Sequence, residues 1–163
     1  MRIITGQFKG RHFDIPRTFK ARPTTDFAKE NIFNVLNGYI DFDGITALDL
    51  FAGTGSISLE LVSRGCKEVV SVEKDRNHAC FIAECMKKIN VENDILIRGD
   101  VFRFLKSCHQ KFDLIFADPP YALPELDTLP DLVFEHDLLA ADGVFVFEHG
   151  KHNDFSAHPR FKE

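Results

Sequence analysis

The sequence predicts an α/β fold in which a doubly wound, mostly parallel sheet carries helices on both faces. From Gly44 onward, short β-rich apolar runs alternate with segments of helical periodicity, which is typical of βαβ units. Right-handed crossovers between successive parallel strands then require a doubly wound sheet. The expected strands cover residues 45–50, 68–72, 94–97, 113–117 and 143–147.

Apolar spacing predicts amphipathic helices between the strands. Ile57 and Leu61 are spaced i, i+4, and Gly65 stands where a C′ glycine ends a helix. A second set has the spacing i, i+3, i+4, i+7 and consists of Ile82, Cys85, Met86 and Ile89.

One more helix is expected before the sheet, from about Asp26 to Tyr39, with Thr24, Thr25 and Asp26 offering N-cap oxygens. Its apolar stripe consists of Ala28, Ile32, Val35, Leu36 and Tyr39. The first 15 residues alternate loosely between apolar and polar side chains and contain two glycines. They predict a small N-terminal β-hairpin.

Length and composition fit one globular domain. The chain has 163 residues, of which 44% are hydrophobic and 28% charged. No apolar run approaches the roughly 18–20 residues of a membrane span, and no signal-peptide core is present, so we expect a cytoplasmic location. The four cysteines lack C-x-x-C spacing and are expected to be reduced. We expect no metal site and a monomer.

Residues 1–22 form a basic segment on an acidic chain. They hold six basic residues and one acid, whereas the whole chain has a net charge of -5. Such a segment can bind a polyanion that the rest of the chain repels; a chance excess of charge in a soluble hairpin is the alternative. We expect an arm over 1–22 and one structural unit over 23–163. The basic residues are Arg2, Lys9, Arg11, Arg17, Lys20 and Arg22.

Acidic residues follow three successive strands, and the first strand runs into a glycine-bearing turn, Asp49 to Ser56. Cofactors bind doubly wound sheets at the carboxyl ends of the strands. A carboxylate beside the turn suits a cationic amino group, as in the methionine moiety of S-adenosylmethionine. Glu73 stands where an acid accepts hydrogen bonds from ribose hydroxyls, and Asp100 is placed to accept a hydrogen bond from an adenine amine. A structural turn and helix N-caps are the alternatives.

The fourth strand ends in Asp118-Pro119-Pro120-Tyr121. Two prolines fix the backbone and leave its carbonyl groups free as acceptors, which suits a planar amine donor. The ring of Tyr121 can stack on a nucleobase. A simple Pro-Pro turn with an exposed tyrosine is the alternative.

These strand-end motifs resemble the class I S-adenosylmethionine-dependent methyltransferases that methylate exocyclic amines, which have a Rossmann-like sheet. Asp-Pro-Pro-Tyr alone also occurs in adenine-N6 methyltransferases. Two N-terminal segments, Arg2 to Arg11 and Arg22-Pro23-Thr24-Thr25-Asp26, are more specific. With them, nearly the whole chain resembles the bacterial 16S rRNA guanine-N2 methyltransferase family. That family finishes with an antiparallel hairpin, so we expect the final antiparallel strands to be missing and the C-terminus to be truncated.

The resemblance implies roles for particular residues. The cofactor would contact Thr24, Asp49, Phe51, Gly53, Gly55, Glu73, Asp100 and Val101. The catalytic residues would be Asp118, Pro119 and Tyr121. The basic arm would bind phosphates of 16S rRNA or of the small ribosomal subunit.

The implied reaction transfers a methyl group to the N2 amine of a flipped guanine. Three alternatives remain open. The chain could methylate adenine N6, methylate a protein glutamine, or be an RNA-binding module without catalytic activity.

Overall fold

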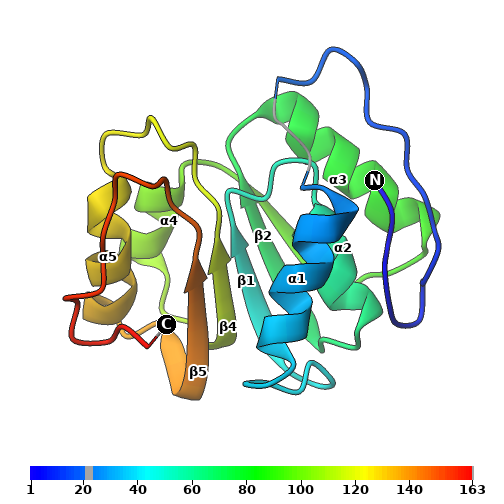
Figure 1. Ribbon diagram of the computed structural model, residues 1–163. Coiled ribbons are helices and arrows are strands. Elements are labelled where there is room, and N and C mark those ends of the chain that lie inside the picture. The colour runs from blue at the N-terminus through cyan, green and yellow to red at the C-terminus, as the bar shows by residue number, and fades with distance from the viewer. Residues whose placement is uncertain (21–23, 163) are drawn as a thin grey trace.

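The computed structural model describes residues 1–20 and 24–162, in which five parallel strands form one sheet in the order β3-β2-β1-β4-β5 (Figure 1). The strands are β1 Thr46–Leu50, β2 Glu68–Glu73, β3 Asp94–Arg98, β4 Phe112–Ala117 and β5 Leu139–Phe147. All five expected strands are confirmed. The fifth begins earlier than expected, because a register shift between Phe112 and Leu114 lets Leu139 pair ahead of the regular ladder.

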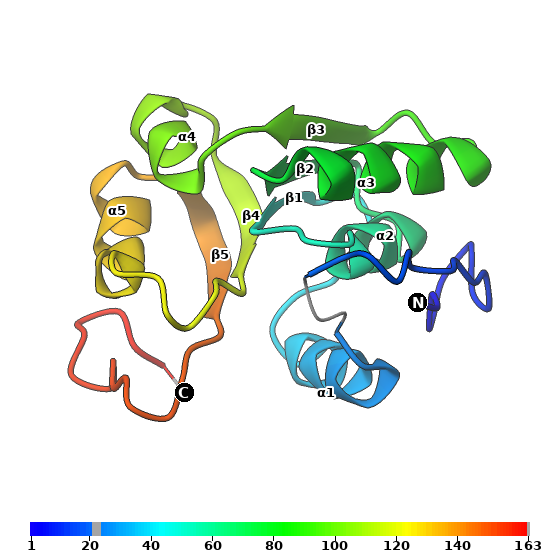
Figure 2. The same ribbon diagram turned by 90° about the horizontal axis from the view of Figure 1, so that it is seen from above.

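Helices cover both faces of the sheet, as expected (Figure 2). On one face lie α1 Asp26–Leu36, α2 Ser56–Ser63 and α3 Arg76–Lys88, and on the other lie α4 Val101–Ser107 and α5 Leu129–Glu135, which a short 3₁₀ turn, Leu126–Thr128, precedes. Leu48 and Leu50 point to the α4–α5 face, whereas Ala47 points to the opposite core. This alternation along β1 is what a sheet buried on both sides requires.

The first helix differs from its sequence prediction. It ends at Leu36 rather than Tyr39, and the next residues form tight turns in which Tyr39 donates its N–H to the Leu36 carbonyl. Phe33 and Leu36 are buried, but Val35 and Tyr39 are 58% and 41% exposed. The predicted apolar stripe is therefore partly wrong. The helix instead turns its Lys29 side inward, where the ammonium group has buried partners.

The first 13 residues form a loop with one antiparallel bridge, between Arg2 and His12, rather than the expected two-stranded hairpin. Ile3 donates to the Arg11 carbonyl at 2.9 Å and Gly10 donates to the Ile3 carbonyl at 2.8 Å. Between these two bonded segments, the N–H group of Gln7 turns toward α2 and donates to the Ser63 carbonyl at 2.8 Å. A Cβ at Gly6 would collide with the Ser63 carbonyl, so the loop can approach α2 this closely only with glycine there.

Glu60 of α2 fixes this loop to the body of the protein. Its carboxylate is fully buried and accepts the backbone N–H groups of Ile4 at 2.8 Å and Thr5 at 3.0 Å. Arg64 donates to the same carboxylate at 2.9 Å, and the Lys29 ammonium lies 3.4 Å from it. A buried carboxylate is stable only when paired and hydrogen-bonded, and this one has both kinds of partner.

Among the described helices, none is long and apolar enough to cross a membrane.

Candidate active site

The carboxyl ends of β1, β2 and β4 meet at one edge of the sheet. β1 pairs with β2 on one side and with β4 on the other, so the strand order reverses at β1. Ligands of doubly wound sheets bind outside the carboxyl ends of strands at such a switch point. Most residues predicted from the sequence to bind a cofactor or to act on an amine lie at or just after the ends of these strands and of β3, whereas Thr24 precedes α1.

The turn after β1 has the strained backbone that close ligand approach requires. Phe51 has φ +58°, Gly53 +59° and Gly55 +83°. Gly55 is the N-cap of α2, and a Cβ there would lie 2.8 Å from Ile82 Cγ1 of α3. Glycine at this position is therefore needed both for its backbone conformation and for helix packing. A non-glycine residue in the left-handed region, such as Phe51, is uncommon and often marks a functional turn.

Glu73 joins the end of β2 to this turn. One carboxylate oxygen, Oε1, accepts the Gly53 N–H at 2.7 Å, and the other, Oε2, accepts the Asp75 N–H at 2.8 Å. The side chain is only 12% exposed. These two hydrogen bonds hold Glu73 in place. Each carboxylate oxygen has a second acceptor position, so Glu73 can still accept hydrogen bonds from hydroxyl groups.

Asp49 lies beneath the turn rather than on the surface of the site. Its side chain is buried and accepts a hydrogen bond from Ser58 Oγ at 2.6 Å. Ser58 Oγ lies 2.7 Å from Ser71 Oγ, which in turn donates to Asp94 at 2.6 Å. Burial raises the pKa of Asp49 from 3.8 to about 7, and burial also raises the pKa of Asp94 to about 6. Two carboxyl groups and two hydroxyls thus connect three strands with α2.

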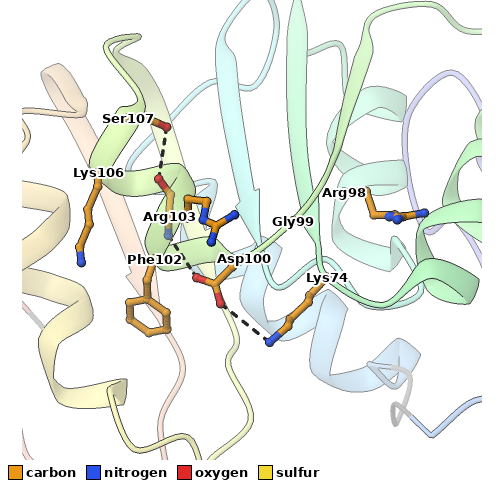
Figure 3. Close-up of a pocket in the computed structure, with 8 residues that line it drawn as sticks. All are labelled: Lys74, Arg98, Gly99, Asp100, Phe102, Arg103, Lys106 and Ser107. Atoms are coloured by element: carbon orange, nitrogen blue, oxygen red, sulfur yellow. Dashed lines mark hydrogen bonds and ion pairs between the residues drawn. The ribbon is translucent and has the colours of Figure 1, made fainter.

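Asp100 caps the next helix and faces an open cavity (Figure 3). It accepts the Arg103 N–H at 3.1 Å, and its other oxygen lies 4.0 Å from the Lys74 ammonium. The cavity has a volume of about 860 Å³ and is lined by Lys74, Arg98, Gly99, Asp100, Phe102, Arg103, Lys106 and Ser107. The side chain of Val101 is buried in the core, so contact from this residue to a ligand would come from its backbone.

Phe102, which the sequence analysis did not identify, lies at the same edge. Its ring meets that of Phe51 edge to face, with 6.4 Å between the ring centroids. Figure 3 shows Phe102 on the same side of α4 as Asp100. An apolar ring beside a carboxylate acceptor is suited to a flat heterocycle that also carries an amine donor.

A second carboxylate, which the sequence analysis missed, lies beside the segment that follows β4. Asp118 follows β4 and Glu148 follows β5, and the strands pair up to Ala117 and Phe147. Burial, together with the Asp118 charge, raises the pKa of Glu148 to about 7. Burial also raises the pKa of Asp118. Sequence alone gave no signal for Glu148, because only the pairing of β4 with β5 brings it to Asp118.

The proline and the tyrosine of this segment have different environments. Pro119 is buried, whereas Tyr121 is 60% exposed. A Cβ at Gly150 would lie 3.7 Å from two ring atoms of Tyr121, so the ring packs over a glycine two residues after Glu148. An exposed aromatic ring therefore stands beside the two carboxyl groups.

The basic arm extends along α3 and does not gather at one place (Figure 1). Arg11 donates to the carbonyl of Lys88, the last residue of α3, at 3.3 Å. Phe19 instead packs on His78 in the first turn of α3, with 4.6 Å between ring centroids. A 13-residue helix is about 20 Å long. Arg17 and Lys20 therefore belong to the part of the arm beside the first turn of α3, nearer the site. Lys9 and Arg11 belong to the part beside the last turn of α3, farther from the site.

Three other predicted residues have separate positions. Arg2 forms an ion pair with Asp26 at 3.2 Å, which holds the arm to α1. Thr24 precedes Thr25, the N-cap whose hydroxyl accepts the Ala28 N–H at 3.1 Å. Arg22 lies outside the described residues.

Solved structures of similar fold confirm the class. A candidate methyltransferase of Escherichia coli, yhhF, superposes with a TM-score of 0.84 at 27% identity, over 94% of this chain and 84% of that chain. The crystal structure of SMU.776, a candidate methyltransferase in complex with SAH, superposes with a TM-score of 0.65 at 22% identity, over 77% of this chain and 36% of that chain. This second likeness concerns the fold alone. Fold and site together define a class I methyltransferase.

Within that class, the chain belongs to the family described as Conserved hypothetical protein 95, which matches residues 1–162. YlbH of Bacillus subtilis (strain 168), a candidate rRNA methyltransferase by its name, is 36% identical over 155 residues, 93% of this chain and 83% of that protein. Ribosomal RNA small subunit methyltransferase D of Escherichia coli (strain K12) is 29% identical over 148 residues, 91% of this chain and 74% of that protein.

Proposed function

We propose that this chain transfers a methyl group from S-adenosylmethionine to the exocyclic N2 amine of a guanine in 16S rRNA of the small ribosomal subunit, as a monomer in the cytoplasm. The observation that carries the proposal is one switch-point edge that holds both the glycine turn with Glu73 and the Asp118 to Tyr121 segment. The names of the Escherichia coli and Bacillus subtilis relatives support rRNA as the substrate.

The strand ends fit S-adenosylmethionine, which presents an ammonium group, ribose hydroxyls and an adenine amine as hydrogen-bond donors. The carboxylates of Glu73 and Asp100 are acceptors of this kind, and at Gly53 a Cβ would have no neighbour nearer than the Phe51 carbonyl oxygen at 4.0 Å, which leaves the turn open to a ligand. When bound, S-adenosylmethionine supplies an electrophilic methyl group. We assign the ribose to Glu73, the adenine to Asp100 with the backbone of Val101 and the ring of Phe51, and the methionine moiety to Gly53 and Gly55.

Two other predicted cofactor residues have less direct roles in the proposal. Asp49 stabilises the turn from below through the hydrogen bond that it accepts from Ser58. Thr24, ahead of α1, borders the cofactor or the target base.

Asp118, Pro119 and Tyr121 act on the target amine. The Asp118 carboxylate and the Pro119 carbonyl accept its N–H groups, which draws the nitrogen lone pair out of conjugation with the ring. The carboxylate then stabilises the positive charge that develops on the nitrogen. Tyr121 is exposed and stacks on the extruded base, an interaction worth about 1–3 kcal/mol.

The arm supplies phosphate contacts to the rRNA, and residues 23–163 supply the cofactor site and the catalytic residues. Arg17 and Lys20 are exposed and belong to the arm end that packs on the first turn of α3, which directly follows β2. They are therefore placed to bind RNA whose target base enters the site.

The alternative substrate is another amine, adenine N6 in DNA or RNA or a protein glutamine. It would use the same cofactor residues and the same Asp118 to Tyr121 segment, so the reaction product separates the two. The test incubates the protein and methyl-labelled S-adenosylmethionine with 16S rRNA or with small subunits from cells that lack the gene. Label in N2-methylguanosine is expected. Label in N6-methyladenosine, or none in RNA while the cofactor binds, would overturn the proposal.

A further inference from the structure

Glu148 stands at the end of β5, beside the proposed catalytic segment. Ala117 and Phe147 pair in parallel register, and the Glu148 N–H donates to the Ala117 carbonyl at 2.9 Å. The next residue on each strand is acidic, Asp118 on one and Glu148 on the other. The sheet register, rather than a flexible loop, therefore sets the separation of the two carboxyl groups.

Within the part of the chain that the structure describes, no cation pairs with either carboxyl group. Of the ion pairs among residues 1–20 and 24–162, none involves Asp118 or Glu148. Both groups are partly buried. Loss of solvent raises the pKa of Asp118, and loss of solvent together with the Asp118 charge raises the pKa of Glu148. Buried carboxylates without donors cost free energy, so the pair is arranged to receive donors from a ligand.

An aromatic surface adjoins the pair. The Tyr121 ring is 60% exposed and packs over Gly150, two residues beyond Glu148. The site thus presents two side-by-side acceptors next to a flat apolar face. Flipped bases are recognised in this way, through their Watson–Crick edge and by stacking.

We propose that Glu148 is a specificity-determining residue which, together with Asp118, accepts the N1–H and N2–H donors of the guanine Watson–Crick edge. The inference rests on the proposed function and extends it from the amine to the whole edge of the base. Guanine presents two adjacent N–H donors there. Adenine presents one donor and one acceptor, its N1.

Two N–H donors from a bound guanine favour the ionised form of both carboxyl groups, and ionised carboxylates can only accept hydrogen bonds. Asp118 and Glu148 therefore satisfy both donors of guanine, whereas adenine N1 would face a carboxylate without a proton between them. A site whose acceptors bind a ligand N–H group discriminates strongly against an analogue without that N–H group. An apolar pocket discriminates much less between ligands that differ only in size. Asp118 alone would hold the amine of either base, so Glu148 is the residue that selects guanine.

The experiment replaces the target base by 2,6-diaminopurine, which keeps the N2 amine but has an acceptor at N1. The modified position is first mapped with the natural substrate, naked rRNA or small subunit, whichever is methylated. The same substrate is then assembled from ligated rRNA carrying guanine or 2,6-diaminopurine at that position. Methyl transfer is measured as kcat/KM for the wild type, Glu148→Gln and Asp142→Asn. Asp142 is an exposed residue of β5, and Asn there is the matched carboxylate-to-amide control.

The wild type and Asp142→Asn are expected to prefer guanine by about tenfold to a hundredfold. Glu148→Gln is expected to lose activity on guanine and to narrow or reverse the preference, because its amide can donate to N1 of 2,6-diaminopurine. Equal wild-type rates on the two bases, or an equal loss on both in Glu148→Gln, would overturn the inference. The wild-type kcat/KM values on guanine and 2,6-diaminopurine test the inference even if Glu148→Gln does not fold. Absence of N2-methylguanosine from the natural substrate would instead overturn the proposed function.

Discussion

Gly53 donates its backbone N–H to Oε1 of Glu73 across 2.7 Å, so a residue 20 positions later in the chain holds the glycine turn. The same carboxylate accepts the Asp75 N–H through its other oxygen. Glu73 therefore has two roles at the switch point. It fixes the turn after β1 and presents acceptors at the end of β2, where the proposal places the cofactor ribose.

Glu73→Gln should weaken the binding of S-adenosylmethionine. Hydrogen bonds to charged groups contribute about 1.5–3 kcal/mol, so we expect a Kd increase of about tenfold or more, measured by calorimetry. The control is Glu68→Gln at the opposite end of β2, where the carboxylate accepts only from Gln110. An unchanged Kd in Glu73→Gln would refute the ribose assignment.

Gly55→Ala should destabilise the fold more than Gly10→Ala does. Both glycines have positive φ, +83° and +85°, so each substitution has the left-handed backbone cost of about 1–2 kcal/mol. Only at Gly55 does a Cβ meet another side chain, at 2.8 Å from Ile82 Cγ1. Urea unfolding of the two variants measures the difference. Equal losses in the free energy of unfolding would show that α3 moves away from the added Cβ without a free-energy cost, which would contradict the prediction.

Asp49→Asn should change how stability depends on pH. Burial raises the pKa of Asp49 from 3.8 to about 7, so its protonated form is favoured in the native state. The stability that this provides is complete below the unfolded pKa and is lost as the pH rises to about 7. Asn still accepts from Ser58 but does not titrate. The free energy of unfolding should therefore fall less in Asp49→Asn between about pH 5 and 8.

The control for the pH series is Asp14→Asn, since the Asp14 side chain is 98% exposed. Asp94, whose pKa is raised to about 6, shifts stability in the same direction and remains in both variants. Identical pH slopes in wild type and Asp49→Asn would contradict the account of the buried chain from Asp49 to Asp94.

The double variant Arg17→Ala/Lys20→Ala should weaken rRNA binding more than Lys9→Ala/Arg11→Ala, although each removes two charges. The first pair belongs to the arm end that packs on the start of α3, and the second to the end near Lys88. Each lost phosphate contact lowers the slope of log affinity against log salt by about one. Filter binding over a salt series measures this slope. A larger effect at Lys9 and Arg11 would place the RNA at the far end of α3, near Lys88, and would contradict the account.

The sequence predicted local features well. Apolar runs and glycine positions located all five strands, and the positive φ of Gly53 and Gly55 agrees with their place in the turn. The short helices α4 and α5 were not identified. Each has only seven residues, which is too few for a clear helical period.

Features that depend on distant pairing were not predictable. The sequence analysis gave Lys29 no place in the core, but its ammonium group is buried 3.4 Å from the carboxylate of Glu60, 31 positions later. Glu148 joins Asp118 only through the register of β4 with β5. Propensity and periodicity describe neighbours along the chain, whereas these contacts follow from the order of strands in the sheet.

The most direct test of the central claim compares wild type and Asp118→Ala in methyl transfer to the rRNA substrate, with cofactor binding measured on the same preparations. If the Asp118 carboxylate holds the target amine, label in N2-methylguanosine should fall by about a hundredfold or more, as for loss of one transition-state hydrogen-bond partner, while the Kd for S-adenosylmethionine stays within about twofold. Unaltered N2-methylguanosine formation by Asp118→Ala would contradict the account.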